Sequence, residues 1–248
     1  ETAHTLGIGS MVYFNDITVN PNTGFKNYEM AIGDLKGFDT QGEPIWAINK
    51  YTSYLYDDNG KQAKPGQMLI CHGCIYDEED VADGFDLRQE KAYLKAKHIT
   101  EVLQGSMPGI PVRIGSFDAP AGVGFIDDNA MSHSELKNSL MSHQAYRNYT
   151  TLMEAEVALL QDLGYDLDRR NFFGSSIYGS HLNLVNNNGF FKRNAEGNAY
   201  LDGEYNTSTL GMGLHVYGSH NHIQQQADLL TVGAGAAGIR VDGEGNTV

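Results

Sequence analysis

Residues 1–8 read ETAHTLGI, a stretch that sets a histidine one helical turn after a glutamate. Glycine often follows the last turn of a helix, where it takes a left-handed conformation, so we expect a helix to end at Gly7. On that helix Glu1 and His4 occupy neighbouring positions one turn apart. A zinc-dependent hydrolase uses such a pair, because the imidazole binds the metal and the carboxylate takes a proton from the metal-bound water.

The complete form of this motif is His-Glu-x-x-His, in which both histidines bind zinc from one helix face. The first histidine would stand immediately before position 1, so we expect a histidine to be encoded directly upstream of Glu1. The chain as given lacks that ligand, and we therefore expect it to bind zinc weakly and to be inactive. Glu-x-x-His is a short pattern that also arises by chance, so its interpretation depends on blocks further along the chain.

Two such blocks follow. Residues 130–143 read AMSHSELKNSLMSH and contain His133 and, later, Met141. Residues 151–166 read TLMEAEVALLQDLGYD, which begins with a capping box from Thr151 to Glu154 and continues with apolar residues at helical spacing. We expect this helix to end at the glycine of the LGYD sequence.

In this order the three blocks resemble zinc metallopeptidases of the metzincin class, over roughly residues 1–170. Short-spaced metzincins carry the third ligand three residues after the glycine, and this chain has Ser10 there. The resemblance is therefore to members with a long insertion before the third histidine, the leishmanolysin-like and secreted bacterial peptidases. It implies that His4 and His133 bind zinc, that Glu1 is the catalytic base, and that Met141 forms the turn beneath the metal.

A tyrosine just after that turn stabilises the oxyanion in some metzincins. Tyr146 and Tyr149 both fit, and Tyr146 is the nearer in sequence. The residues alone leave simpler interpretations open. His133 lies in a serine-rich stretch that is typical of a polar loop, and Met141 lies between apolar residues, as core methionines do. His220 and His222 form a His-x-His pattern without a nearby acid or cysteine, and we expect them to face solvent.

The two cysteines, Cys71 and Cys74, flank a histidine and a glycine. A disulfide closing a four-residue loop in an oxidising compartment is the first interpretation. A redox pair or half of a metal site is the second, although a structural zinc site needs two further ligands. A pair of free thiols is the third.

The net charge is −14, with 31 acidic and 17 basic residues, which argues against a nucleic-acid partner because phosphate binding needs a basic surface. We find no apolar run of about 20 residues, the length that would span a bilayer. Within residues 1–175 we expect short strands at 11–14 and 46–56 and a helix from about 87 to 104, where alanines, isoleucine and leucine recur at helical spacing.

After about Tyr178 helical spacing disappears, and Asn, Gly, Ser and Thr separate short stretches such as residues 182–185 and 213–217. This texture is typical of a β-solenoid, in which each rung combines a strand and a turn. It also resembles the start of an autotransporter passenger, which implies a possible link to an outer-membrane barrel outside this chain.

We therefore expect an α+β chain with two parts. Residues 1–175 form the C-terminal part of a metzincin-like catalytic domain, and residues 176–248 begin a β-solenoid-like region. The expected function is that of a secreted or surface-displayed bacterial zinc endopeptidase acting on a protein or peptide substrate. The alternative is a non-enzymatic passenger used for adhesion that carries a degenerate peptidase-like module. A histidine upstream of Glu1 favours the enzyme, and any other residue favours the alternative.

Overall fold

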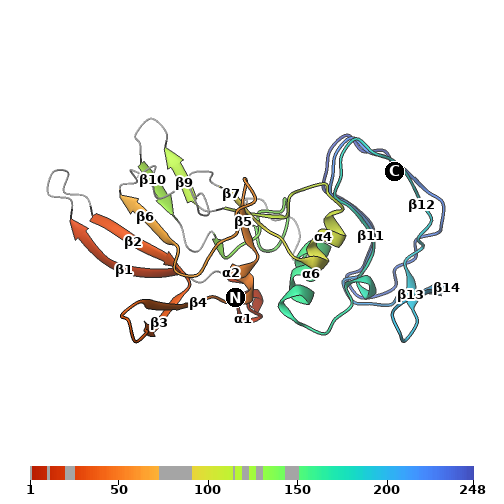
Figure 1. Cartoon of the computed structure of the whole chain (residues 1–248). Coiled ribbons are helices and arrows are strands. Elements are labelled where there is room, and N and C mark those ends of the chain that lie inside the picture. Colours follow the sequence, from red (N-terminus) through yellow and green to blue (C-terminus); the bar gives the residue numbers. More distant parts are fainter. Residues whose placement is uncertain are drawn as a thin grey trace. The chain divides into compact units, whose positions relative to one another are not determined.

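The computed structural model describes residues 2–9, 12–19, 26–72, 91–113, 115–118, 123–126, 131–142 and 151–248 (Figure 1). The fold is of the α+β type, with several small sheets, none of which is closed within these residues. The chain forms two compact units. The first unit comprises Glu1–Lys95, Pro108–Leu136 and Met141–Ala145, and the second comprises Ala96–Met107, Lys137–Leu140 and Tyr146–Val248.

The described part of the first unit has two short helices and several antiparallel strands. Two of its sheets have three strands each, in the orders β1-β2-β6 and β5-β7-β8, and two further pairs are β3-β4 and β9-β10. The bounds are α1 Thr2–Thr5, β1 Val12–Val19, β2 Lys26–Ile32, β3 Asp34–Phe38, β4 Pro44–Ala47, α2 Lys50–Ser53, β5 Leu55–Asp57, β6 Met68–His72, β7 Lys91–Leu94, β8 Ile110–Arg113, β9 Gly115–Asp118 and β10 Val123–Ile126.

The helix predicted over residues 87–104 is wrong at residues 91–94, while residues 87–90 lie outside the described part of the chain. Residues 91–94 are strand β7, which pairs with β5 and β8 and buries Ala92 and Leu94 completely. Only helix α4, Lys97–Leu103, remains of the prediction. The alanine spacing also suits a central strand, and pairing with neighbours on both sides outweighs the local helical preference. The stretch 46–56 likewise contains helix α2 between two strands.

The second unit combines helices α4 and α6, Glu154–Leu163, with strands that stack in parallel. Helices α4 and α6 pack against each other. The N-terminus of α4 has no side-chain cap of its own, and the Asp162 carboxylate of α6 accepts from the backbone N–H groups of His98 and Ile99. The remaining elements are η2 Arg169–Asn171, β11 Phe173–Ile177, β12 Asn183–Asn186, β13 Phe191–Arg193, β14 Tyr200–Tyr205, β15 Met212–Val216, β16 His222–Gln225 and β17 Ala237–Val241.

Helix α6 begins later than the capping box at Thr151 predicts. Its N-cap is the buried Met153, whose backbone N–H donates to the Glu156 carboxylate at 2.8 Å. The Thr151 hydroxyl is buried and has no hydrogen-bond partner among the described residues. The predicted box does not form. The Glu154 carboxylate, its predicted acceptor, instead accepts from the Arg169 guanidinium. The helix ends at Gly164 in a left-handed conformation, with φ 110°, as predicted.

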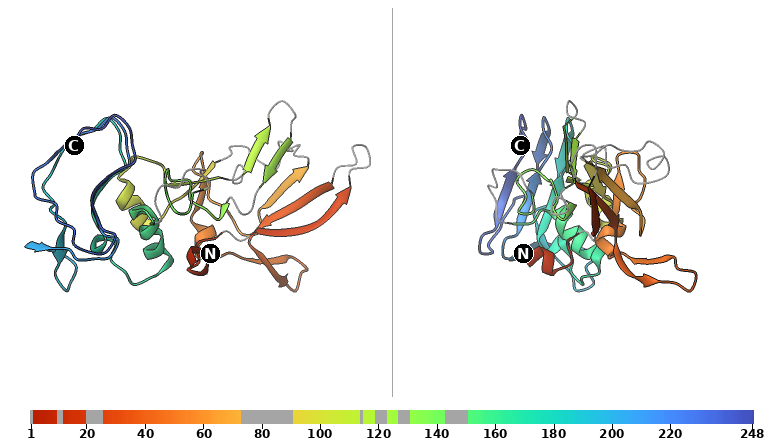
Figure 2. Two further views of the ribbon diagram at one scale, coloured as in Figure 1. Left: turned by 180° about the vertical axis from the view of Figure 1, so that it is seen from behind. Right: turned by 90° about the vertical axis from the view of Figure 1, so that its left-hand side faces the viewer.

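Three successive passes of the chain lie one over another in the second unit (Figures 1 and 2). Strands β11, β15 and β17 form one parallel sheet, and β12 and β16 form another. Partners in the first two passes are 39 residues apart, as for Asn186 and Gln225, whose side chains are hydrogen-bonded. Partners in the next two are 25 residues apart, as for Asn221 and Asn246. The longer pass contains the antiparallel hairpin β13–β14. We name these strands and their turns, residues 173–248, the stack.

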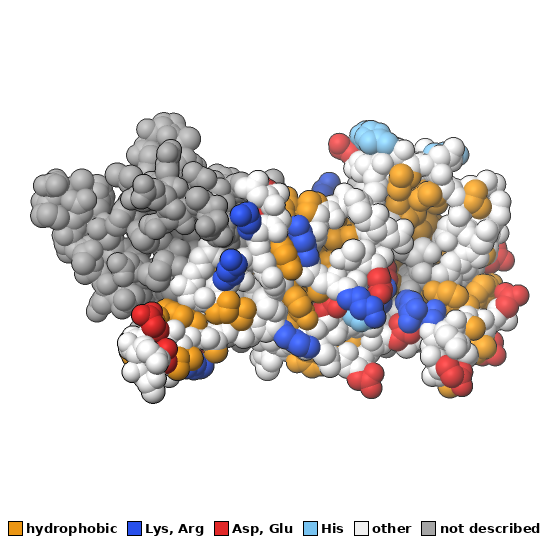
Figure 3. All heavy atoms as spheres, viewed as in Figure 1, with side chains coloured by type: hydrophobic (Ala, Val, Ile, Leu, Met, Phe, Trp, Pro, Cys, Tyr) orange, Lys and Arg blue, Asp and Glu red, His pale blue; other side chains and the backbone are white. Residues whose placement is uncertain are grey.

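The stack contains a buried apolar cluster, and its surface is mixed. Leu214, Val216 and Ile223 are buried together, with Ile177 and Leu229 packed against them. Apolar side chains also remain exposed on the visible face of this unit (Figure 3). The exposed apolar residues of the stack include Val185 and Val232. Among the described residues, no helix is both long and apolar enough to cross a membrane.

Glycines at the corners of the stack allow successive passes to approach closely. A Cβ atom on Gly218 would lie 1.8 Å from the Gly179 carbonyl oxygen, and one on Gly243 would lie 1.9 Å from the Gly218 carbonyl oxygen. Backbone atoms rather than flexible side chains fill this space, so the structure cannot accept a methyl group there without moving a corner.

Gly218→Ala should therefore destabilise the stack by about 1–3 kcal/mol, the usual cost of forcing extra volume into a packed site. Gly238→Ala is the matched control, because a Cβ atom there meets nothing within 4 Å. The measurement is urea unfolding of the full chain followed by far-UV circular dichroism. Equal stability of the two variants would contradict the close packing of the corners.

Candidate functional site

Helix α1 carries the first candidate ligand, His4, as the sequence predicts. The helix ends at Thr5, and the turn after it contains Gly7, whose φ of 86° lies in the left-handed region and whose N–H donates to the His4 carbonyl at 2.9 Å. This turn directs the chain back over the helix. The carbonyl of the buried Ile8 then lies 2.6 Å from the Nδ1 atom of His4. The predicted left-handed glycine is thus confirmed, and the turn fixes the orientation of the imidazole ring.

The segment 131–136 carries the second candidate ligand, His133, and is attached to the core of the first unit. The hydroxyl of the fully buried Tyr51 donates to the Met131 carbonyl at 2.8 Å. Further along, the Glu135 N–H donates to the carbonyl of Pro111, in strand β8, at 2.7 Å. Met131 and Leu136, at the two ends of the segment, are buried. His133 is therefore held between two fixed points.

These two histidines, which are 129 residues apart in sequence, meet in space. Their Nε2 atoms are 3.3 Å apart. Their ring centroids are 4.9 Å apart, and the ring planes are almost perpendicular, at 85°. Two nitrogen ligands at ~2.0–2.1 Å from a tetrahedral zinc ion lie about 3.3–3.4 Å from each other. The separation of the two nitrogens therefore matches that of adjacent ligands on one zinc ion.

The hydrogen bonding of His4 suits a metal ligand. A carbonyl oxygen only accepts, so the contact with Ile8 requires a proton on Nδ1 of His4. In the neutral ring the lone pair is then on Nε2, which is the atom that faces His133. Metal-binding histidines commonly donate their other ring N–H to a backbone carbonyl in this way, which fixes the tautomer and the ring orientation. Without a metal, the same geometry allows a hydrogen bond from His133 to His4.

The other predicted site residues are only partly described. Met141 is buried and belongs to the same unit as the histidine pair. Glu1, Tyr146 and Cys74 lie outside the described residues, so their predicted roles stay predictions. Cys71 lies on strand β6, opposite Tyr28 of β2. Within the described residues, no group of three or more His, Cys, Asp or Glu side chains is placed to hold a metal ion.

The residues that hold His4 and His133 in place were not predicted from the sequence. Tyr51 belongs to no motif, and a backbone carbonyl such as that of Ile8 has no sequence signal. Asn49, which caps helix α2 through its side-chain oxygen, also donates to the Gly9 carbonyl at 2.8 Å. His220 and His222 are exposed, as predicted.

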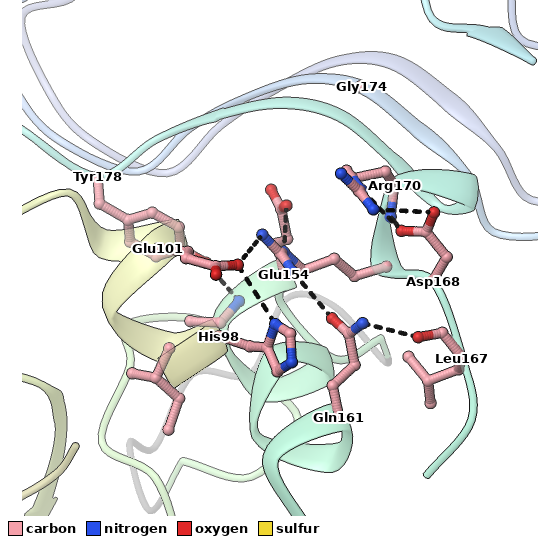
Figure 4. A network of polar contacts seen from close by, with 12 residues as sticks. His98, Glu101, Glu154, Gln161, Leu167, Asp168, Arg170, Gly174 and Tyr178 are labelled. Carbon is pink, nitrogen blue, oxygen red and sulfur yellow. Dashed lines mark hydrogen bonds and ion pairs between the residues drawn. The ribbon is translucent and has the colours of Figure 1, made fainter. Parts of the chain in front are cut away.

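A second polar cluster lies in the second unit (Figure 4), and its Glu154, Gln161 and Glu101 side chains all accept from Arg169. The guanidinium donates to Glu154 at 3.2 Å, to Gln161 at 3.0 Å and to Glu101 at 3.3 Å. Glu101 in turn contacts His98 at 3.3 Å. Arg169 and Glu154 are buried, with 8% exposure each. The cluster therefore joins α4, α6 and η2 through one shared cation.

The two carboxylates of this cluster respond differently to their surroundings. Burial raises the pKa of Glu154, and the neighbouring Ser176 and Arg169 offset this only in part. Burial also acts on Glu101, but its contacts with His98 and Arg169 outweigh it and lower the pKa. A pocket of about 470 Å³ opens beside the cluster and includes Tyr200 in its lining. Because the charged groups of the cluster already pair with one another, we interpret it as structural.

Comparisons of the chain with protein-family models, with curated proteins and with solved structures gave no match.

Proposed function

We propose that the protein is a zinc-dependent endopeptidase and that His4 and His133 are two of its zinc ligands. The observation that supports the proposal is the 3.3 Å separation of their Nε2 atoms, together with the His4 tautomer that the Ile8 carbonyl selects. Both residues also belong to the motif blocks of the sequence. Two unrelated surface histidines that are 129 residues apart in sequence are not expected to lie with their Nε2 atoms facing each other.

Bound zinc would polarise the scissile carbonyl and activate a water molecule. Glu1, one turn before His4, would accept the proton of that water and later deliver it to the leaving amine. The residue immediately upstream of Glu1 would complete the ligand set as the first histidine of the motif. Met141 would lie beneath the site without a chemical step, and Tyr146 would stabilise the oxyanion.

The stack supports the second part of the proposal, a location outside the cell. Parallel strands that repeat over three passes are the pattern of a β-solenoid, and we propose that the stack begins one. On this proposal the peptidase is secreted or displayed on a bacterial surface. The same observation favours the alternative function, a passenger used in adhesion whose peptidase-like module has lost its activity.

The test uses protein expressed from its complete gene and measures zinc affinity by competition with a fluorescent chelator. His4→Ala and His133→Ala should each weaken zinc binding at least tenfold, since each removes a direct ligand and even supporting residues cost about 10–100-fold. His181→Ala is the control, because this histidine is exposed and lies on the stack. The adhesin alternative predicts that all four proteins, wild type included, fail to retain zinc.

A further inference from the structure

One short helix of the first unit is hydrogen-bonded to both of the segments that carry the candidate ligands. Helix α2 (Figure 1) and its N-cap occupy residues 49–53, within the long stretch of chain between His4 and His133. The helix, its cap and both histidines all belong to the first unit. The stretch that separates the two ligands in sequence therefore contains an element that contacts the chain beside each of them.

The side-chain amide of Asn49 joins the helix to the segment that follows His4. Its Oδ1 atom accepts from the backbone N–H of Thr52 at 2.8 Å, and its Nδ2 atom donates to the Gly9 carbonyl at 2.8 Å. A backbone N–H only donates and a carbonyl only accepts, so a single orientation of the amide satisfies both partners. Gly9 directly follows Ile8, whose carbonyl holds the His4 ring. The cap of α2 thus also fixes the end of the turn that orients His4.

The hydroxyl of Tyr51 joins the same helix to the segment that precedes His133. It donates at 2.8 Å to the carbonyl of Met131, two residues before the histidine. Tyr51 is 0% exposed and Met131 is 2% exposed. Water therefore cannot replace this hydrogen bond if the hydroxyl is removed, and its loss carries the cost of a buried polar group. Two residues of one helical turn thus hold two segments from distant parts of the chain.

The two segments approach each other closely where α2 holds them. A Cβ atom on Gly9 would lie 3.7 Å from Nδ1 of His4 and 3.8 Å from the hydroxyl oxygen of Ser132. The contact between the two histidine rings is itself exposed, and a hydrogen bond there contributes only modestly to stability. The contact between the rings is therefore too weak to set their spacing, and the buried attachments of the backbone have to do so.

We propose that Asn49 and Tyr51 position the two zinc ligands, with helix α2 as the common support that sets the spacing of His4 and His133 before the metal binds. This inference rests on the proposed zinc site. Both residues act through the backbone of the ligand segments and are positioning residues. A preformed site binds its ligand more tightly, because less ordering has to accompany binding. Loss of either contact leaves both histidines present but lowers the fraction of molecules in which they face each other.

The test compares Asn49→Asp and Tyr51→Phe with two controls in protein expressed from its complete gene. Aspartate caps a helix as well as asparagine does, but it replaces the donor that faces Gly9 with an oxygen. Phenylalanine removes only the hydroxyl. Asn59→Asp adds the same charge at an exposed position of the same unit, and Leu55→Val weakens the core of that unit in strand β5.

We expect Asn49→Asp and Tyr51→Phe each to weaken zinc binding roughly tenfold, as loss of other supporting groups does. The visible absorption spectrum of bound Co²⁺ should also change in both, because it reports the ligand geometry. Asn59→Asp and Leu55→Val should leave the zinc affinity and the spectrum unchanged, which separates positioning from added charge and from general stability.

Hydrogen exchange of the metal-free protein tests whether α2 supports both segments as one element. Exchange of residues 5–9 should quicken in Asn49→Asp, and exchange of residues 131–136 should quicken in Tyr51→Phe. Asn49→Ala also removes the cap of α2, so it should quicken exchange in both segments, although the Asn49 side chain donates to the first of them. Both segments should stay slow in the two controls.

The outcomes separate the inference from the proposed function. If His4→Ala and wild type retain zinc equally, the proposed function fails, and the exchange data still decide the inference. If zinc needs both histidines but Asn49→Asp and Tyr51→Phe match their controls in every readout, only the inference is overturned. If Asn49→Ala quickens exchange of residues 5–9 alone, the two contacts act separately and the common support is overturned.

Discussion

Glu1→Gln, in protein expressed from its complete gene, should lower the rate of peptide hydrolysis by about 10²–10⁴-fold, the usual contribution of a general base. Zinc affinity should stay close to that of the wild type, because the glutamate of the motif faces the water and is not a ligand. The amide of glutamine keeps the size of the side chain but cannot accept the proton. The measurement pairs cleavage of a quenched protein substrate with chelator competition on the same samples.

The control for Glu1→Gln is Glu244→Gln, which removes one exposed carboxylate from the stack. It should leave both hydrolysis and zinc affinity unchanged. Full activity of Glu1→Gln would remove this residue from the mechanism. A parallel loss of zinc and activity would instead make Glu1 a ligand, which differs from the role that the motif predicts.

Arg169→Met should destabilise the second unit by about 3–5 kcal/mol, the cost of removing one partner of a buried ion pair. Methionine preserves much of the buried volume but leaves the Glu154 carboxylate without its cation. The effect is best followed by hydrogen exchange of the α6 amides, since the only tryptophan, Trp46, is in the first unit. Arg170→Met is the control, because this arginine pairs with Asp168 nearer the surface and such pairs contribute about 0–1 kcal/mol.

The destabilisation by Arg169→Met should depend on pH. Burial already raises the pKa of Glu154 above its ordinary value, and loss of Arg169 raises it further. A carboxyl group with a raised pKa in the folded state contributes its stability at low pH and loses it as pH rises through that pKa. The variant should therefore be closer to the wild type near pH 4 than near pH 8. A loss that is the same at both values would mean that Arg169 does not lower the pKa of Glu154 in the folded protein.

Local signals in the sequence predicted the ends of elements well and their nature less well. The glycines at 7 and 164 end helices in left-handed conformations because no Cβ opposes that geometry. The stretch at 91–94 has helical spacing, yet it forms β7 because β5 and β8 provide partners from distant parts of the chain. The capping box failed for a similar reason, since Glu154 is taken by Arg169, 15 residues later.

The candidate site was predicted from the order of motif blocks and not from any local pattern. Nothing in a stretch of eight residues indicates that His4 meets His133. The stack, in contrast, has a sequence repeat whose spacing of 39 residues equals the spacing of paired residues in its first two passes. The tetrapeptide Tyr-Gly-Ser-His occurs at residues 178–181 and again at 217–220, and the two copies lie at equivalent corners, where the rings of His181 and His220 stack. The third copy has diverged, with Gly245 beside His220.

The hairpin β13–β14 shows how this unit can change during evolution. It accounts for the greater length of the first pass, and the chain still returns into register at β15 and β16. Because the parallel pairing requires only that each pass come back to the same place, residues can be added to the outward excursion or removed from it without altering the strands above and below. The hairpin is thus a protrusion whose length and surface can diverge between related proteins, or be replaced by design, while the scaffold that carries it stays constant.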